Sequence, residues 1–374
     1  MQSFFSFIFL IFLLVPSCDK KHKFDLPNPA HSGDDLTSIP HNPHPYDLKK
    51  PEFFPTMPIP ADNPMTVEGV KLGRYLFYDP ILSSDSTQSC SSCHIQKFGF
   101  SDGKALSTGV AGKQGRRSAM ALVNVGYLSN GLFWDGRVST LEEQLLQPVA
   151  DPLEMNENWD HVEEKLRRHA VYPRMFREAF PIENTQEITR KLVAKVIAQF
   201  ERTLVSANSR YDKAVSSNSN GFKLRKQELD GYFLFFLDIA TNHPGCHHCH
   251  NSRTFGMDEY FNNGLEAVQT LNDFPDKGRG AVTGYIRDNG KFRAPTLRNI
   301  SLTAPYMHDG RFKTLDEVLD HYISGGHYAQ NRDANVSGFK MTAQERESLI
   351  AFLTALTDTS FVNNPAFRSP FVKQ

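Results

Sequence analysis

The sequence predicts a mainly α-helical protein made of two related domains with long loops. A five-residue motif occurs twice, as Cys90-Ser-Ser-Cys93-His94 and as Cys246-His-His-Cys249-His250. A longer repeat follows each motif, because Asp135-Gly-Arg-Val-Ser-Thr-Leu-Glu-Glu143 returns as Asp309-Gly-Arg-Phe-Lys-Thr-Leu-Asp-Glu317. No segment shows the sustained alternation of apolar and polar residues that a β-sheet needs.

The repeated motif is the attachment signature of c-type haem. Its two thiols bond covalently to one porphyrin, and the histidine that follows becomes an axial ligand of the iron. Four of the five cysteines of the chain lie in these motifs. Disulfides and zinc are the alternatives, but neither requires a histidine directly after each second cysteine. The predicted attachment residues are Cys90, Cys93, Cys246 and Cys249, with His94 and His250 as iron ligands.

The N-terminus predicts export. Residues 1–17 form an apolar run too short to cross a bilayer comfortably, which is typical of a signal peptide. Val15-Pro16-Ser17-Cys18 resembles a bacterial lipobox, so we expect a lipid anchor on Cys18 that holds the chain at the membrane, in the periplasm or cell envelope. A plain secretory signal is the alternative. The net charge of −1, with no block of Lys or Arg, gives no indication of nucleic-acid binding.

The first domain is predicted to span residues 59–207, after a Pro/His-rich segment, residues 18–58, that reads as a tether or an extended arm. A helix starts near Thr66 and stops at Asp79-Pro80. A glycine-rich stretch, Phe98 to Gly115, is expected to wrap the haem edge. Thr140-Leu-Glu-Glu143 is a capping box that opens the next helix. Helical patterns follow over Trp159–His169 and Gln186–Val205.

The second domain is predicted to span residues 208–374, beginning with a polar boundary stretch from Asn208 to Gly221. A helix over Lys226–Thr241 leads into the second motif, and an irregular segment, Thr254–Lys291, follows it. A second capping box, Thr314-Leu-Asp-Glu317, opens a helix that ends near Gly325, and Thr342 caps a final amphipathic helix. The chain therefore reads as two cytochrome c-like haem domains with long loops.

The two haems differ in their expected sixth ligand. No histidine lies between His94 and His161, and the only methionines near in sequence are Met120 and Met155, which makes an open first haem plausible. An open ferric haem that reacts with peroxide needs a proton-transferring group and polar support for the splitting charge. Gln144 and Glu154 supply an amide and a carboxylate after the first motif.

Taken together, these motifs resemble the bacterial dihaem cytochrome c peroxidase family, which includes the MauG group. The resemblance runs from about Val67 to the final helix. The motifs that carry it are Leu72-Gly-x-x-Leu-Phe-Tyr-Asp79-Pro80, the two Cys-x-x-Cys-His motifs, Phe133-Trp-Asp-Gly-Arg137, Thr140-Leu-Glu-Glu-Gln144, Leu302-Thr-Ala-Pro-Tyr306 and His308-Asp-Gly310.

The resemblance implies roles for individual residues. The N-terminal haem would be the peroxide site, and the C-terminal haem would pass electrons to it through Trp134. Gln144 and Glu154 match the distal glutamine and the acid–base glutamate of the family. Thr303 and Pro305 match carbonyl ligands of a structural calcium.

Two departures from the family pattern stand out. The stretch Phe100–Gly115 lacks the loop histidine that blocks the first iron in many of these peroxidases, so the first haem needs no reductive activation, as in the MauG group. Ser118 stands where the family has an asparagine that reaches the calcium, so calcium stays open.

The resemblance also bears on the sixth ligand of the second haem. It is a methionine in the peroxidases and a tyrosine in the MauG group, and the corresponding position here is Tyr322. Met307 ranks second, and His308 and His321 are further rivals.

The sequence therefore predicts an exported dihaem cytochrome c peroxidase. It would reduce hydrogen peroxide to water with electrons from a small periplasmic donor, either a cytochrome c or a cupredoxin. A MauG-type oxidase that modifies side chains of a partner protein is the second hypothesis, and a non-catalytic dihaem electron carrier is the third. The donor and the oligomeric state stay open, with a homodimer as one candidate.

Overall fold

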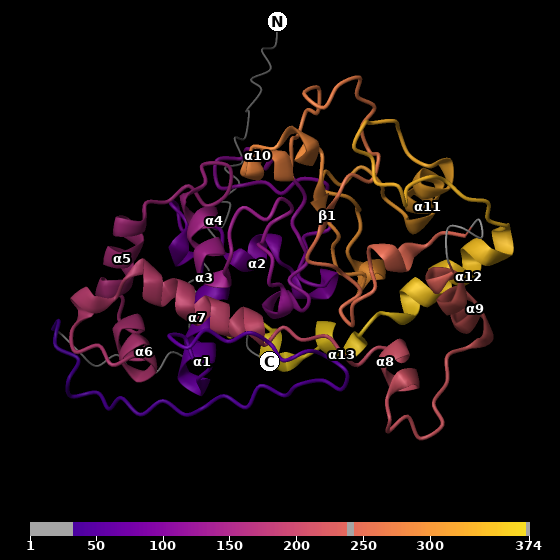
Figure 1. The fold of residues 1–374 in the computed structure, drawn as a ribbon. Coiled ribbons are helices and arrows are strands. Elements are labelled where there is room, and N and C mark those ends of the chain that lie inside the picture. Colours follow the sequence, from indigo (N-terminus) through magenta and orange to yellow (C-terminus); the bar gives the residue numbers. More distant parts are fainter. Residues whose placement is uncertain (1–32, 238–242, 372–374) are drawn as a thin grey trace, which may run out of the picture.

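The computed structural model describes residues 33–237 and 243–371, and it is mainly helical (Figure 1). The predicted signal peptide and Cys18 lie outside the described residues. A two-residue antiparallel pair, β1 (Tyr260–Phe261) with β2 (Phe292–Arg293), is the named sheet of the described ranges. None of the helices in those ranges is long and apolar enough to cross a membrane. The α-helices are α1 (Val67–Tyr78), α2 (Cys90–Cys93), α3 (Leu141–Gln144), α4 (Leu146–Ala150), α5 (Trp159–Arg168), α6 (Tyr172–Ala179), α7 (Arg190–Arg202), α8 (Arg210–Val215), α9 (Lys226–Phe236), α10 (Arg279–Thr283), α11 (Leu315–Ser324), α12 (Ala343–Ala355) and α13 (Thr359–Val362).

The predicted capping residues begin the predicted helices. The Thr66 hydroxyl accepts the Gly69 N–H at the start of α1, and the Thr342 hydroxyl accepts the Glu345 N–H at the start of α12. Thr140 and Thr314 cap α3 and α11 in the same way. Such caps satisfy backbone donors that have no partner within the helix.

Other helix predictions needed correction. The pattern over Gln186–Val205 divides into a 3-10 turn, Thr185–Glu187, and α7. The polar stretch Asn208–Gly221 contains α8, which forms because Ser209 and Asp212 make a capping box. No pattern in the sequence predicted α6. The prediction that a helix continues to Thr241 falls partly on residues outside the described ranges, and α9 ends at Phe236.

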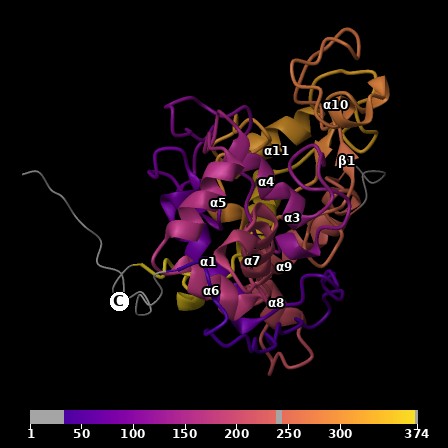
Figure 2. The same cartoon turned by 90° about the vertical axis from the view of Figure 1, so that its left-hand side faces the viewer.

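Each half of the molecule is built around one crossing of two helices, with α1 on α7 in the first half and α9 on α12 in the second. Glycine allows both crossings, because a Cβ on Gly73 would lie 1.8 Å from the Val196 carbonyl oxygen and one on Gly231 would lie 1.9 Å from that of Ser348. Figure 2 looks onto the first half, with α5, α6 and α1 toward the viewer. Separate apolar clusters fill the two halves.

The repeat seen in the sequence is also a repeat of backbone shape. Asn124 and Asn299 both adopt left-handed conformations, with φ of 59° and 61°. Phe133 and Met307, each two residues before an Asp-Gly-Arg sequence, have φ of 64° and 76°. Residues without glycine's freedom rarely adopt this region, so its recurrence at matched positions indicates two copies of one unit.

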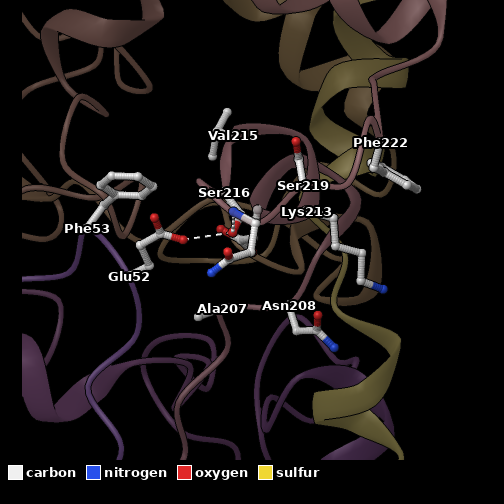
Figure 3. Close-up of a pocket in the computed structure, with 11 residues that line it drawn as sticks. Glu52, Phe53, Ala207, Asn208, Lys213, Val215, Ser216, Ser219 and Phe222 are labelled. Carbon is white, nitrogen blue, oxygen red and sulfur yellow. Dashed lines mark hydrogen bonds between the residues drawn. The ribbon is translucent and has the colours of Figure 1, made fainter.

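Segments near both ends of the described chain contact both halves. Leu36, from the N-terminal arm, and Phe361 and Phe367, from the C-terminal segment, all pack in the apolar cluster of the first half. Further along the arm, Glu52 accepts a hydrogen bond of 2.7 Å from the Ser216 hydroxyl beside a pocket next to α8 (Figure 3). Residues 33–58 therefore lie along the surface as an extended arm (Figure 1). The domain limits drawn from the sequence stay predictions.

Candidate active site

The first Cys-x-x-Cys-His motif forms a single helical turn. Cys90 and Cys93 are the two ends of α2, and His94 follows directly as its C-cap. The His94 Nδ1 lies 2.8 Å from the Phe100 carbonyl oxygen. Because a carbonyl only accepts, Nδ1 must carry the proton, and Nε2 is left as the nitrogen that can bind a metal.

The second motif repeats this arrangement. The His250 Nδ1 lies 3.1 Å from the Phe255 carbonyl oxygen. Phe100 and Phe255 both have positive φ, of 61° and 54°, so the same unusual backbone turn aims each carbonyl at a histidine. Burial lowers the pKa of both imidazoles, that of His250 to about 4, and a neutral imidazole is the form that binds iron.

The alternatives to haem do not fit the four described cysteines. Cys90, Cys93, Cys246 and Cys249 are all free thiols. Among residues 33–237 and 243–371, no group of three or more His, Cys, Asp or Glu side chains converges as a metal-binding cluster. Paired thiols directly before a buried histidine are the donor set that covalent haem requires.

Glu154 lies beside the first motif. Its carboxylate contributes, after the larger effect of burial, to raising the pKa of the Cys90 and Cys93 thiols, so it lies near both. Burial and the nearby Asp151 raise the pKa of Glu154 itself, while Arg137 opposes the shift. A carboxyl group with a raised pKa holds a proton more readily than an exposed one, which suits a group that accepts and returns protons.

Gln144 is half-buried at the end of α3, and its side chain makes no hydrogen bond within the described ranges. The repeat pairs Thr140 with Thr314, and therefore Gln144 with Val318 and Pro148 with Tyr322. Val318 and Tyr322 line a cavity in the second half. By this register, Gln144 and Pro148 belong to the matching face of the first half.

The cavity of the second half has a volume of 260 Å³ and is lined mainly by apolar side chains. Residues of the second motif line it, together with both leading candidates for a sixth ligand, Tyr322 and Met307. His308 also lines the cavity, with its ring stacked on Phe292 at a centroid distance of 3.7 Å. His321 is buried, and its Nε2 donates to the Asn263 carbonyl oxygen at 2.8 Å.

Trp134 joins the two halves at this cavity, which its side chain also lines. The indole N–H donates to the Ser118 carbonyl oxygen at 3.0 Å. The Ser118 N–H donates to the His308 carbonyl oxygen at 2.8 Å, and the Ser118 hydroxyl donates to that of Met307 at 2.9 Å. Ser118 therefore links Trp134 by hydrogen bonds to the turn that carries Met307 and His308, two candidate ligands of the second haem.

Comparison with known proteins gives the same picture. The model of the di-haem cytochrome c peroxidase family matches residues 67–220. The methylamine utilization protein MauG of Methylorubrum extorquens is 34% identical over 309 residues, which are 83% of each chain. The cytochrome c551 peroxidase of Nitrosomonas europaea is 34% identical over 319 residues, 85% of this chain and 87% of that protein.

The chain belongs to the di-haem cytochrome c peroxidase family. The crystal structure of a MauG-like protein associated with microbial copper homeostasis superposes with a TM-score of 0.80 at 35% identity, covering 87% of this chain and 100% of that one. The predicted fold of cytochrome c-like haem domains is thereby confirmed. Membership of a di-haem family implies that haem is the cofactor. Its relatives carry both names, peroxidase and MauG.

One buried acid of this family member was missed from the sequence. Glu201, on α7, is 3% exposed, and its Oε2 has no hydrogen-bond partner within the described residues. Burial raises its pKa to about 8, against the attraction of Arg202. Its carboxylate also raises the pKa of Cys90, so it lies near the first motif. No signal in the sequence pointed to it, because the burial of Ala198–Arg202 on every side of α7 is set by the fold.

The predicted calcium ligands lie together, but their donor set is weak. Thr303, Pro305 and Ser118 all line the cavity of the second half. The Ser118 hydroxyl already donates to the Met307 carbonyl oxygen. Calcium prefers six to eight oxygen donors, including carboxylates, and these residues bring only a few neutral oxygens. Calcium binding stays a prediction.

Proposed function

We propose that this di-haem protein reduces hydrogen peroxide to water at the haem carried by His94, using electrons from a small exported donor protein. The single observation that carries the proposal is Glu154, a carboxyl group whose pKa is raised by burial beside the first haem-attachment motif. An electron carrier needs no such proton-exchanging group. Relatives named cytochrome c peroxidase support the same activity.

The residues have distinct roles in this proposal. Haem, when bound, supplies the iron chemistry by which one H₂O₂ takes up two electrons and two protons and becomes two waters. Glu154 accepts a proton from the incoming peroxide and returns it to the departing oxygen. Gln144, which carries an amide donor, orients the peroxide and supports the charge that develops as the O–O bond breaks.

Trp134 is the proposed electron connection between the halves. Its indole donates to Ser118, which also donates to the backbone of Met307 and His308 at the cavity of the second half. An aromatic ring fixed at this junction shortens the route for electrons that enter through the second half. The donor itself is a small cytochrome c or cupredoxin.

The proposal is tested by steady-state peroxide reduction with a pre-reduced small cytochrome c and with a reduced cupredoxin. We expect turnover with at least one donor, and a strong loss in Trp134→Phe with both haems still present. Protein loaded with both haems that consumes no peroxide with either donor refutes the peroxidase and leaves the electron carrier.

Covalent attachment of both haems through the two cysteine pairs is part of the proposal. Haem should remain with the chain on a denaturing gel. Changing Cys90 and Cys93 to Ala should remove half of that signal, and changing all four cysteines should remove all of it. A signal that survives the fourfold change contradicts covalent attachment at these residues.

A MauG-type activity is the second candidate, because a tyrosine, Tyr322, lines the cavity of the second half. The relative named MauG at 34% identity supports this reading. In that case peroxide should lead to oxidised side chains on a partner protein. Mass spectrometry of proteins encoded or purified together with this chain would detect them, and unmodified partners would argue against it.

We also propose that the chain is exported and anchored by a lipid on Cys18. The apolar run before Val15-Pro16-Ser17-Cys18 supports this. Labelling with a radioactive fatty acid should mark the wild-type protein and fail to mark Cys18→Ser, which should still acquire haem. Equal labelling of both proteins contradicts the anchor.

A further inference from the structure

Asn263 contacts both leading candidates for the sixth ligand of the second haem. It follows β1 and lines the same cavity as Tyr322 and Met307. Its Nδ2 lies 3.4 Å from the Tyr322 hydroxyl oxygen and also 3.4 Å from the Met307 sulfur. One amide group therefore stands between two side chains that compete for the same metal position.

The backbone of Asn263 is fixed to the helix that carries Tyr322. The His321 Nε2 donates to the Asn263 carbonyl oxygen at 2.8 Å, and His321 precedes Tyr322 on α11. At the end of α11, Gly326 has a φ of 62°, and a Cβ there would lie 3.2 Å from the same carbonyl oxygen. This backbone contact does not use the Asn263 side chain, so substitutions of that side chain leave it in place.

Met307 is held on the opposite side by its own backbone. Its φ of 76° lies in the left-handed region, which costs about 1 kcal/mol or more for a residue with a side chain. The Ser118 hydroxyl fastens this turn by donating to the Met307 carbonyl oxygen at 2.9 Å. The thioether thus stays within reach of the cavity while Tyr322 is also present.

We propose that Asn263 is a positioning residue that selects Tyr322 over Met307 as the sixth ligand of the second haem. The inference rests on the proposed function, because it requires haem on His250. The selection has a physical basis, since an amide N–H bonds far more strongly to a phenolate oxygen than to a thioether sulfur. The amide stabilises the bound phenolate and leaves the thioether as a spare ligand. Without the amide, coordination by the neutral Met307 thioether becomes more stable than coordination by the Tyr322 phenolate.

The test compares Asn263→Leu with the wild-type haem protein. Leucine has a similar size and no donor. A hydrogen bond to a charged oxygen is worth enough to change the ligand ratio roughly tenfold. We expect electron paramagnetic resonance and near-infrared magnetic circular dichroism to report tyrosinate ligation in the wild type. In Asn263→Leu the methionine signature should replace most of it, and the midpoint potential of that haem should rise, because methionine raises it.

Asn335→Leu is the matched control. Asn335 lines the same cavity, and its side chain makes no hydrogen bond to Tyr322 or Met307 in the described ranges. This variant should keep the wild-type spectrum. Adding Met307→Leu to Asn263→Leu should remove the methionine signature.

A wild-type spectrum in Asn263→Leu overturns the inference, as does a wild-type haem whose sixth ligand is Met307 or any residue other than Tyr322. Should Asn263→Leu fail to fold, Asn263→Asp, which keeps the size and replaces the donor, must give the same shift. Peroxide turnover is measured in parallel. A wild-type protein that has tyrosinate ligation but no turnover refutes the peroxidase alone, and turnover with an unchanged Asn263→Leu spectrum refutes the inference alone.

Discussion

Replacing Glu154 by glutamine removes a proton-transferring group and almost nothing else. The Glu154 side chain accepts no hydrogen bond within the described ranges, so no other residue loses a partner, and the one new polar group is the glutamine NH₂. Its backbone contacts are kept, namely the N–H bonded to the Asp151 carbonyl at 3.0 Å and the carbonyl that accepts from Val110 at 2.9 Å. We therefore expect the free energy of unfolding to change by no more than about 1 kcal/mol.

The expected effect on catalysis is much larger. A positioned acid–base group contributes roughly 10²- to 10⁴-fold, which corresponds to about 3–5 kcal/mol in the activation barrier. Peroxide reduction by Glu154→Gln, measured at pH 7 with haem content matched to wild type, should fall by that factor. Because burial raises the pKa of Glu154, the wild-type rate should also fall as the pH drops through that raised value, and the variant should lack this acidic limb.

Glu157→Gln is the control from the same turn. Glu157 accepts hydrogen bonds from Lys165 at 2.7 Å and from the Asn158 N–H at 2.9 Å. Losing its charge should cost about 1–3 kcal/mol of stability and leave the catalytic rate per haem nearly unchanged. A Glu154→Gln rate within threefold of wild type, or equal losses of rate in both variants, would refute the assignment of Glu154 as the acid–base group.

Three further predictions concern other residues. The pKa of Glu201 is raised from 4.5 to about 8, so the wild-type protein loses stability as the pH rises from 4.5 toward 8. Glu201→Gln avoids this loss. In denaturant titrations, its free energy of unfolding relative to wild type should grow by on the order of 1 kcal/mol per pH unit across that window. Asp358 is 2% exposed and accepts from the Ala207, Asn208 and Phe361 N–H groups, so Asp358→Ala should lower the free energy of unfolding by more than about 3 kcal/mol, whereas the exposed Asp85→Ala should change it little. Pro148→Tyr, at the position that the repeat pairs with Tyr322, should give the first haem a sixth ligand and abolish peroxide turnover, and an unchanged high-spin signal would contradict the pairing.

Local features of the fold followed from the sequence because local chemistry decides them. Thr66, Thr140, Thr314 and Thr342 begin helices because a hydroxyl at that position satisfies a free backbone N–H. The two attachment motifs needed only the identity and spacing of their own residues. The helix α8, inside the stretch predicted only as a domain boundary, could not be predicted, because its cap, Ser209 with Asp212, has the composition of a loop.

Contacts between residues that are far apart in the sequence could not be predicted in this way. Ser118 holds Trp134 on one side and the Met307–His308 turn on the other through backbone groups, which leave no trace in side-chain patterns. Asn263 reaches Tyr322 across 59 positions of the chain, and an asparagine in an irregular loop is usually read as a turn residue. Glu201 was hidden within an amphipathic pattern because burial of its helix on all sides is a tertiary effect.

The repeat explains how one unit gives two different sites. Counting from the paired capping threonines, Tyr322 of the second half corresponds to Pro148 of the first. In the second half α11 runs without a break through Tyr322, and the phenol lines the cavity. In the first half the helix is interrupted at Leu145, and a proline, whose ring has no atom that can bind iron, takes the matching position. Further along, the chain turns at Asp151, and Glu154 lies near the Cys90 and Cys93 thiols, whose pKa it helps to raise. The two copies therefore differ at one paired position, where a phenol that can bind iron stands opposite a proline that cannot.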